Sequence, residues 1–409
     1  MAASGTADDG REVLLLVVDA GGGHRAAANA LLAAVDQSGP GYRLRVENLQ
    51  AILDPLDPVR RLTGRRIESL YNAMVRRRRT GHLVPLLRGL QWGIRFMRRP
   101  LARQVAAHLS AARPDLVVSM LPNFNGVLRD AVEQACPDVP FVVLLTDLAD
   151  FPPHFWLESG LDGALVGSEE AAGQARGCGL AEEGVVRTSG MVLHPRFYAE
   201  GGEALRARVR AELGLRADAF VVLLLFGGKG APEILPLAQM LLAEDVRWHV
   251  IAVCGDNPRL HERMGAVETA ARGRLHRLGF TDRIPDLLGA ADLLLTKPGP
   301  GSLAEAFHRR VPVVVTLDKR TIPQERFNAT FVQEHGLGVV VESWRDMPAV
   351  VRELFARPER LATLRSALDA LPENRAVWEV LAHFGRWCGA AGAGAPESAP
   401  RHEGVTERS

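Results

Sequence analysis

The chain alternates short apolar runs with glycine-rich turns and helical stretches. The first run, residues 13–18, contains no polar side chain, and an alanine-rich segment follows at residues 26–35. Between them stands the sequence Asp19-Ala20-Gly21-Gly22-Gly23-His24-Arg25. The apolar run predicts a buried strand, and the glycines let the chain turn tightly into a helix whose first N–H groups have no partner. This order is the opening of a Rossmann-like βαβ unit.

Ten further strand-like segments, most of them apolar runs, repeat the pattern. They span residues 42–47, 115–120, 141–145, 163–167, 185–188, 220–226, 246–253, 275–278, 292–295 and 311–317. Helical segments separate the runs, which favours a parallel sheet, and polar or glycine residues follow many of the runs. Open parallel sheets bind ligands at the C-terminal ends of their strands. The pattern therefore predicts an α/β protein with mostly parallel sheets and ligand-binding loops at one edge.

The pattern is interrupted once, which divides the chain into two units. Residues 190–197, with Pro195, end the first unit, and a charged helix at 203–213 opens the second. A length of 409 residues also favours two domains. We predict Rossmann-like domains at 13–197 and 198–370, a flexible N-terminus at 1–12, a closing helix at 371–388 and a disordered tail at 389–409.

Composition limits the class of protein. Hydrophobic residues make up 47% of the chain and charged residues 24%, as in an ordinary folded protein, and the net charge is only +1. The first twelve residues contain acids and no long apolar core, so we expect neither a signal peptide nor an anchor there. No apolar stretch is long enough to span a bilayer. The four cysteines lie far apart, without metal or redox spacing, which favours a reducing cytoplasm.

Positive charge is concentrated at residues 60–103. This segment contains thirteen arginines against the single acid Glu68, interleaved with aliphatic and aromatic residues such as Trp92 and Phe96. Such a segment can lie on an anionic membrane surface, and nucleic acid is the alternative partner. A solvated helical hairpin is the plainer interpretation. Because the whole chain has a net charge of only +1, this local concentration of positive charge favours a surface-binding role. We expect an anionic membrane surface, and not nucleic acid, to be the partner.

Two glycine turns in the second unit have the features of a diphosphate site. Gly227-Gly228-Lys229-Gly230 and Lys297-Pro298-Gly299-Pro300-Gly301-Ser302 each follow a strand and precede a helix, so their N–H groups can face an anion. Only three lysines occur in the chain, and two of them stand in these turns. Each turn alone is a weak signal, but the pair predicts a diphosphate cradle. The nearby Glu305 would accept hydrogen bonds from ribose hydroxyls, or else stabilise its helix.

Metal binding is not indicated by these turns. Neither turn matches a Walker A motif, and the chain contains no Asp-x-Asp triplet. We therefore expect no metal and no cofactor, and amides, helix dipoles and lysines would stabilise the charge of a departing diphosphate.

His24 is the candidate base of the first unit. A histidine near its free pKa can take a proton from an attacking hydroxyl, and Asp19 and Asp147 stand at strand ends where either can orient it or assist. A structural role is the alternative for a single loop histidine. Read literally, Gly21-x-Gly23-x-x-Ala26 also satisfies the dinucleotide fingerprint, with Glu47 as the ribose ligand. An NAD-dependent oxidoreductase would, however, leave both turns of the second unit without a ligand.

Motifs in both units resemble one family of glycosyltransferases. The first unit contributes residues 19–26, Thr146-Asp147-Leu148 followed by His154-Phe155-Trp156, and residues 190–197. The second contributes residues 227–230, 254–257, 279–281, 296–306 and 323–328. In this order they resemble the monogalactosyldiacylglycerol synthases and the related bacterial diacylglycerol glucosyltransferases, over about residues 13–341. The lipid-linked N-acetylglucosaminyltransferase of peptidoglycan synthesis is more distantly similar.

The resemblance implies a GT-B fold, in which two Rossmann-like domains face each other across a cleft. It implies inverting, metal-independent transfer of a hexosyl group from a UDP-sugar to a lipid acceptor such as diacylglycerol, by a peripheral protein on the inner face of the cell membrane. His24 would be the base or an acceptor-side residue. The implied donor site consists of Gly228, Lys229, Gly255, Asn257, Phe280, Thr281, Lys297, Gly299, Gly301, Ser302, Glu305, Gln324, Glu325 and Asn328.

Within that site the resemblance suggests separate roles. Phe280 and Thr281 would hold uracil, and Glu305 the ribose. Gly228, Lys229, Gly299 and Gly301 would approach the diphosphate, and Gln324, Glu325 and Asn328 would bind the sugar or lie beside it.

The chain departs from the family pattern at two places. Leu193-His194-Pro195 replaces a Val-Arg-Pro type sequence, and Arg326-Phe327 replaces a small residue and glycine. The alternative to an enzyme is a UDP-sugar- or membrane-binding module without turnover, against which the retention of both His24 and Glu305 argues.

Overall fold

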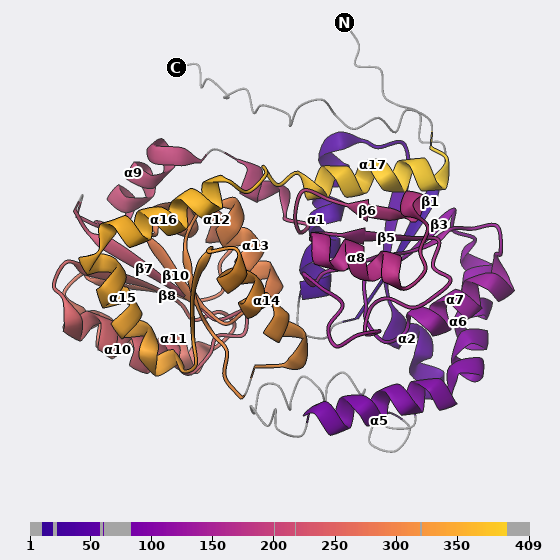
Figure 1. The fold of residues 1–409 in the computed structure, drawn as a ribbon, viewed down its shortest axis with the longest axis horizontal. Helices are drawn as coiled ribbons and strands as arrows, with labels where there is room; N and C mark the ends of the chain where they lie inside the picture. Colours follow the sequence, from indigo (N-terminus) through magenta and orange to yellow (C-terminus); the bar gives the residue numbers. More distant parts are fainter. Residues whose placement is uncertain are drawn as a thin grey trace, which may run out of the picture.

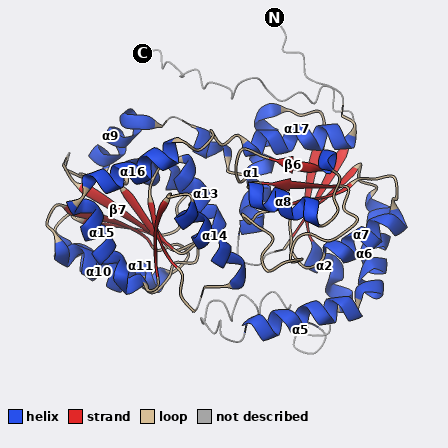
Figure 2. Cartoon of the chain, viewed as in Figure 1, coloured by secondary structure: helices blue, strands red, loops and turns tan. Residues whose placement is uncertain are grey.

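The computed structural model describes residues 10–18, 23–57, 60, 83–199, 201–216, 218–319 and 321–390. These residues form two α/β halves that lie side by side, each built around a parallel six-stranded sheet (Figure 1). Helices cover both faces of each sheet (Figure 2). The architecture agrees with the predicted pair of Rossmann-like domains.

The N-terminal sheet has the strand order β2-β1-β3-β4-β5-β6. Its strands are β1 (Glu12–Val17), β2 (Arg43–Asn48), β3 (Leu116–Ser119), β4 (Phe141–Leu144), β5 (Gly163–Val166) and β6 (Val185–Arg187). Strand β1 pairs in parallel with both β2 and β3, so the direction of winding reverses between β1 and β3. Ligands bind at such reversal points in open α/β sheets, and α1 starts at this one.

Alternate side chains of β1 enter two separate cores. Leu14 and Leu16 pack toward α2 (Leu49–Leu53), α6 (Arg98–Ala112), α7 (Asn125–Ala135) and α8 (Glu169–Gly177). Leu15 and its neighbours pack toward α1 (Gly23–Ser38) and α17 (Ala376–Cys388). Because both faces of a parallel strand are buried in this way, the strand reads as an unbroken apolar run in the sequence.

The C-terminal sheet has the order β12-β11-β10-β7-β8-β9. Its strands are β7 (Phe220–Leu225), β8 (Trp248–Val253), β9 (Leu275–Leu278), β10 (Leu293–Thr296), β11 (Val313–Thr316) and β12 (Gly338–Val341). This is the order of the dinucleotide-binding doubly wound fold, with its reversal between β7 and β10. Strand β12 was not predicted, although its residues 339–341 are three consecutive valines.

Eight helices surround the second sheet and its connections, and short 3-10 turns occur in both halves of the described chain. The helices are α9 (Gly202–Glu212), α10 (Ile234–Glu244), α11 (Pro258–Ala271), α12 (Ile284–Ala290), α13 (Pro300–His308), α14 (Pro323–Glu334), α15 (Met347–Ala356) and α16 (Pro358–Asp369). The 3-10 turns are η1 (Asp54–Leu56), η3 (Glu182–Gly184), η4 (Pro195–Tyr198) and η5 (Trp344–Asp346).

The chain crosses between the two halves twice, and the two crossings are hydrogen-bonded to each other. Asn374 donates through Nδ2 to the carbonyl of Met191 at 2.9 Å, and the backbone N–H of Arg375 donates to Ser189 Oγ at 2.6 Å. These contacts explain why the closing helix begins only at Ala376, five residues after the predicted start at 371. Helix α17 then packs on the first half, and the Tyr42 hydroxyl donates to the carbonyl of Leu381 at 2.7 Å.

The basic segment is only partly described, as residue 60 and residues 83–103. Within it lies α5 (Leu83–Phe96), at the lower edge of the molecule in Figure 1. Trp92 and Phe96 are 70% and 76% exposed, and their rings stack at 5.7 Å. In the described part of the chain, no helix is long and apolar enough to cross a membrane.

Candidate active site

His24 stands in the first turn of α1, beside the reversal point of the N-terminal sheet. Its Nδ1 lies 2.8 Å from Thr146 Oγ1, and its ring lies 5.5 Å from the ring of Trp156. When Nδ1 carries the proton and donates to Thr146, the lone pair lies on Nε2, which makes no hydrogen bond within the described residues. The geometry therefore holds the ring and leaves one nitrogen for a ligand.

Burial lowers the pKa of His24 to about 4. The imidazole is therefore neutral at pH 7, as a proton acceptor must be. A pKa this low also makes His24 a weak base before a substrate binds. Negative charge that develops on the reacting groups would favour the protonated ring and raise the pKa during a reaction.

Asp147 lies close to His24 but does not orient it through a hydrogen bond. Its buried Oδ2 accepts from Trp156 Nε1 at 2.9 Å, and burial raises the pKa of this carboxyl to about 7. The contact with His24 is made instead by Thr146, the preceding residue, which corrects the expected direct partner. Adjacent side chains on a chain segment point in different directions, so only one of the two meets the imidazole. Asp19, the other candidate, lies outside the described residues.

A buried carboxylate shapes the loop that carries Trp156. Asp150 accepts hydrogen bonds from the backbone N–H groups of His154, Phe155 and Trp156 at 2.9, 2.9 and 2.6 Å. Asp147 then holds the indole from the other side. In the sequence, residues 154–156 were only part of a motif. The signal for their role was a run of aromatic residues following two closely spaced aspartates.

On the second domain, the two predicted glycine turns follow β7 and β10, the adjacent strands that flank the reversal point. The backbone of the turn after β7 packs directly on the turn after β8: a Cβ on Gly255 would lie 2.4 Å from the Gly228 carbonyl oxygen. Gly255 also has a φ of +56°, a backbone conformation that favours glycine. Both the close approach and the backbone conformation therefore require glycine at this position. Asn257 caps α11 and donates to the Gly230 carbonyl at 3.2 Å. Gly255 and Asn257 thus maintain the shape of the turn at residues 227–230.

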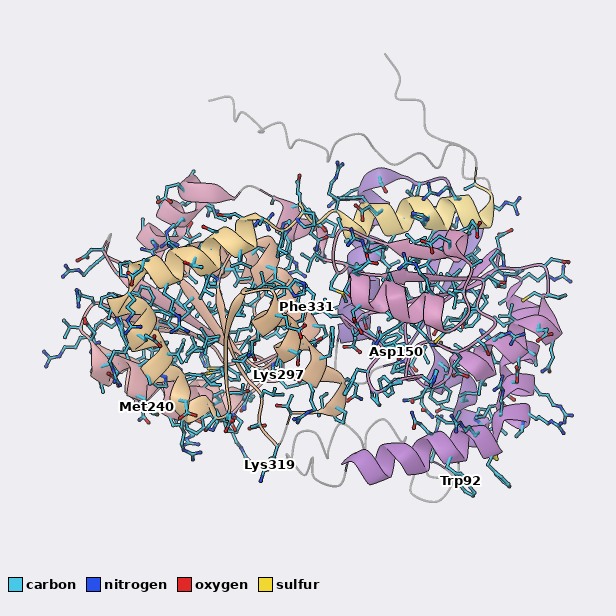
Figure 3. The ribbon with its side chains drawn as sticks, in the orientation of Figure 1. Trp92, Asp150, Met240, Lys297, Lys319 and Phe331 are labelled. Atoms are coloured by element: carbon cyan, nitrogen blue, oxygen red, sulfur yellow. The ribbon has the colours of Figure 1, made fainter. Side chains whose placement is uncertain are left out.

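The two loop lysines are in different environments. Lys229 is paired with Asp256 at 2.8 Å, and both side chains are largely exposed. Lys297 is paired with Glu325 of α14 and lies closer to the first domain, since its charge and that of Glu325 both act on the pKa of Asp147. Figure 3 shows Lys297 on the side of its domain that faces Asp150. Lys297 is therefore the better placed of the two to act opposite His24.

Next to this pair, α13 begins at Pro300, immediately after Gly299. The backbone N–H groups of Gly301 and Ser302 lie in its first turn, where an α-helix supplies no internal partner. The positive end of the helix dipole is directed to the same place. This helix start is an anion-binding feature at the carboxyl end of β10.

Phe280, Thr281 and Glu305 form the outer part of the predicted nucleotide site. The Phe280 ring is 77% exposed and would lie 3.9 Å from a Cβ on Gly228. The Thr281 hydroxyl accepts from the Arg283 backbone N–H at 3.1 Å. Glu305 makes no side-chain hydrogen bond within the described residues, and burial raises its pKa to about 7. It lies in the second turn of α13, so a helix-capping role does not account for it.

Arg196 is a neighbour of this site that the sequence did not single out. It lies in η4, the start of the first crossing, and its Nη1 donates to the carbonyl of Asp282 at 3.3 Å. Its positive charge also lowers the pKa of Glu305 against the effect of burial. The chain lacks an arginine at position 194, where the family pattern has one, but carries this arginine two residues later. Only the fold shows that it reaches the second domain.

The first half of α14 supplies buried polar groups without partners. Asn328 is fully buried and donates from Nδ2 to the carbonyl of Pro298 at 2.8 Å, but its Oδ1 accepts no hydrogen bond from the part of the chain that the structure describes. Gln324 is also buried, and its Oε1 has no partner within the described residues. Buried acceptors normally have hydrogen-bond partners. The two unpaired side-chain oxygens beside Glu325 are therefore suited to a ligand with several hydroxyl groups.

The two domains also enclose a cavity between α8 and α14. Its volume is about 460 Å³, and it is lined by Glu169, Glu170, Gly173 and Gln174 from the first domain and by Phe327, Phe331, Glu334 and His335 from the second. The Phe331 and His335 rings stack at 4.0 Å. Phe327, at one of the two departures from the family pattern, therefore lines the interdomain space. Among the described residues, no group of three or more His, Cys, Asp and Glu side chains is arranged to hold a metal ion.

These features define a class of protein: two facing doubly wound domains with the nucleotide-type loops on the second, which is the GT-B fold. Residues 221–376 match the glycosyltransferase family 28 C-terminal domain. Similar solved structures are MurG of Acinetobacter baumannii (15% identity, TM-score 0.58, covering 92% of this chain and 99% of that one) and Anabaena Alr3699/HepE in complex with UDP-glucose (17%, 0.51, covering 92% and 98%).

The particular resemblance is to the monogalactosyldiacylglycerol synthases. Monogalactosyldiacylglycerol synthase 1 of Arabidopsis thaliana is 28% identical over 376 residues, which cover 85% of this chain and 66% of the relative. The chain spans 60–70% of the length of the first three such relatives. The resemblance and the fold predicted from the sequence are thereby confirmed. The matched residues 221–376 also include both glycine turns of the second domain. A dinucleotide bound in the first loop would leave these turns without a ligand.

Proposed function

We propose that this chain is an inverting, metal-independent glycosyltransferase that moves a hexosyl group from a UDP-sugar to a membrane lipid, diacylglycerol or a close analogue. The observation that carries the proposal is the opposition of two half-sites. His24, neutral and with Nε2 available, stands on one domain, and Lys297 and the start of α13 stand on the other. The names of the relatives support the lipid acceptor, and the UDP-glucose complex of a GT-B neighbour supports the donor.

The donor would lie along the carboxyl edge of the second sheet. The exposed Phe280 ring offers a stacking surface for uracil, and the Glu305 carboxyl, which has no hydrogen-bond partner among the described residues, can accept from ribose hydroxyls. The diphosphate would meet the first turn of α13. The hexose would then lie toward Gln324 and Asn328, whose orphan carbonyl oxygens can accept its hydroxyl hydrogens.

The chemistry would be a single displacement at the anomeric carbon. His24 Nε2 takes the proton of the acceptor hydroxyl while that oxygen forms its bond to the anomeric carbon and the bond to the UDP oxygen breaks. One displacement inverts the configuration. The negative charge that leaves with UDP is stabilised by the α13 amides and by Lys297, so the proposed transfer needs no cofactor.

Membrane association would use the basic segment and α5. The stacked Trp92 and Phe96 side chains are exposed on that helix, and aromatic side chains of this kind insert at the boundary of head groups and acyl chains. Arginines of the same segment would attract anionic lipids. We propose a peripheral position on the inner face of the cell membrane, without a nucleic-acid partner.

The test is transfer by purified protein with diacylglycerol vesicles and each of UDP-glucose, UDP-galactose, UDP-glucuronate and UDP-N-acetylglucosamine. One donor should release UDP and yield a glycolipid detectable by mass spectrometry. His24→Ala should abolish transfer and retain UDP binding. UDP binding without release from any donor would favour a module without turnover, and NAD binding without UDP binding would favour the oxidoreductase alternative; either result would overturn the proposal.

A further inference from the structure

Away from the proposed active site, the second domain carries a cluster of arginines around one aspartate. Asp292 lies just before β10 and is buried, and its Oδ1 accepts from Arg206 Nη2 at 2.7 Å and from Arg365 Nη2 at 3.0 Å. Its Oδ2 accepts from Arg210 Nη2 at 2.7 Å and from the Val221 N–H at 2.8 Å. Three guanidinium groups thus share one carboxylate, which balances only one of their charges.

A cavity of about 250 Å³ adjoins this cluster. The charged side chains that line it are Glu203 and Arg206 of α9, Asp292, Arg309 and Arg310 after α13, and Arg365 of α16. Four arginines of the lining therefore face two carboxylates, an excess of two positive charges. Arg310 is held in place, since both of its Nη groups donate to the backbone carbonyls of Leu368 and Leu371. The charge of the cavity wall is thus fixed by the fold.

The environment of Arg309 is a second, independent observation that favours a ligand in this cavity. Its Nε is buried and has no hydrogen-bond partner within the described residues. Its Nη1 lies against the backbone at Gly201, where a Cβ would come within 2.7 Å of it. The nearby acid that acts on its charge, Asp286, is itself paired with Arg283 at 3.3 Å. The Arg309 side chain lines the cavity, and burial lowers its pKa, so an anion in the cavity would offset the cost of desolvating this guanidinium group.

We propose that this cavity binds a small anion bearing a phosphate group. Guanidinium groups present pairs of N–H donors that match phosphate oxygens, and an excess of two positive charges suits a doubly charged phosphate group. The volume lies below the range typical of sites for drug-sized ligands. Inorganic phosphate or a compact phosphomonoester therefore matches the site, and a nucleotide does not.

The site is separate from the proposed donor site. Arg309 and Arg310 follow the C-terminal end of α13, whereas the donor loops lie at its N-terminal end, about 13 Å away for a helix of this length. The cavity touches α9, which follows the first crossing between the domains, and α16, which precedes the second. A bound anion would therefore bridge the helix after the first crossing and the helix before the second crossing. Such a bridge would restrict motion between the two domains.

The position favours a dissolved anion over a lipid head group. Helices α9 and α16 lie at the upper left of Figure 1, and α5 with its exposed aromatic pair lies at the lower right. A membrane held by α5 is therefore remote from the cavity. The inference does not depend on the proposed transfer reaction, because phosphate binding and its effect on stability can be measured without a donor or an acceptor.

The experiment is calorimetric titration of the full chain with inorganic phosphate at constant ionic strength, together with thermal unfolding in phosphate and in chloride. We expect saturable binding and a higher Tm in phosphate. Arg309→Gln and Arg365→Gln should each weaken phosphate binding about tenfold or more, as expected for loss of a charge-assisted hydrogen bond. Arg352→Gln is the matched control, since this exposed arginine of α15 is paired with Glu244 of α10, outside the cavity.

UDP and lipid vesicles complete the test. UDP should not compete with phosphate, and Arg309→Gln should leave binding to phosphatidic acid vesicles unchanged. The proposal would be overturned by absence of phosphate binding, by unchanged phosphate affinity in both cavity variants relative to the unaltered chain, or by displacement of phosphate by UDP. Loss of vesicle binding in Arg309→Gln would likewise overturn it in favour of a lipid head group. Should a variant unfold, broadening of the phosphate 31P resonance by the unaltered chain, with and without saturating UDP, decides the same question.

Discussion

The environment of His24 leads to a prediction about the pH dependence of transfer. A pKa of about 4 in place of the ordinary 6.5 corresponds to about 3 kcal/mol in favour of the neutral ring. At pH 5.5 a histidine with the ordinary pKa would be about 9% neutral, whereas His24 would be about 97% neutral. The base form should therefore persist far into the acid range, and the kcat/KM for transfer should not lose this base between pH 7.5 and 5.5.

The assay is kcat/KM for UDP release from pH 4.5 to 8.5, combined with NMR titration of the His24 ring in the free protein. The ring resonances are identified by their loss in His24→Gln. Asp147 and Glu305 have pKa values raised to about 7, so each contributes its own change near neutrality. Profiles of Asp147→Asn and Glu305→Gln separate those changes from the titration of His24.

Replacing Thr146 tests the same geometry from the other side. Thr146→Val keeps the shape and removes the hydroxyl 2.8 Å from Nδ1, and Thr146→Ser is the control that keeps the hydroxyl. A hydrogen bond of this kind contributes about 0.5–1.5 kcal/mol, so kcat/KM should fall about 2- to 12-fold in the first variant only. A ring titration near 6.5 in the free protein, or equal activity of both Thr146 variants, would refute the reasoning.

Three further predictions concern stability, donor binding and the membrane. Asp147→Asn should raise the free energy of unfolding at pH 8 by about 2–4 kcal/mol, measured by urea titration. The reason is that a buried carboxyl with a raised pKa destabilises the fold as the pH rises from about 4 to 7. The gain should therefore vanish at pH 4. Phe280→Ala should weaken UDP binding by about 1–3 kcal/mol in calorimetry without lowering Tm, since the ring is exposed; unchanged affinity would remove the stacking role. The double variant Trp92→Ser with Phe96→Ser should reduce sedimentation with anionic vesicles and leave UDP binding intact, and full retention on vesicles would contradict a membrane role for α5.

Much of the fold was predictable because of where its strands lie. Eleven of the twelve described strands were expected from the sequence. A strand buried on both faces, such as β7, tolerates no polar side chain and reads as an apolar run, whereas the edge strand β2 alternates polar and apolar residues. The missed strand, β12, contains three consecutive valines but is only four residues long. The glycine turns were predictable for a related reason: they occur where strands end, and the carboxyl edge of a parallel sheet is where ligands bind.

The partners of individual side chains were not predictable. Sequence order placed Asp147 and Thr146 equally near His24, and only the path of the loop decided that Thr146 contacts the ring while Asp147 holds Trp156. Arg196 belongs to the first unit by sequence but reaches the carbonyl of Asp282 in the second.

The sequence by itself therefore determined the two sheets, the loops at their edges and the family resemblance. Burial selects apolar residues and tight turns select glycine, so these features can be recognised from local sequence. The tertiary structure alone decided which charges meet. Asp292 gathers Arg206, Arg210 and Arg365 from segments more than seventy residues away on either side. Such contacts depend on how helices pack across a sheet, and no spacing along the chain encodes them.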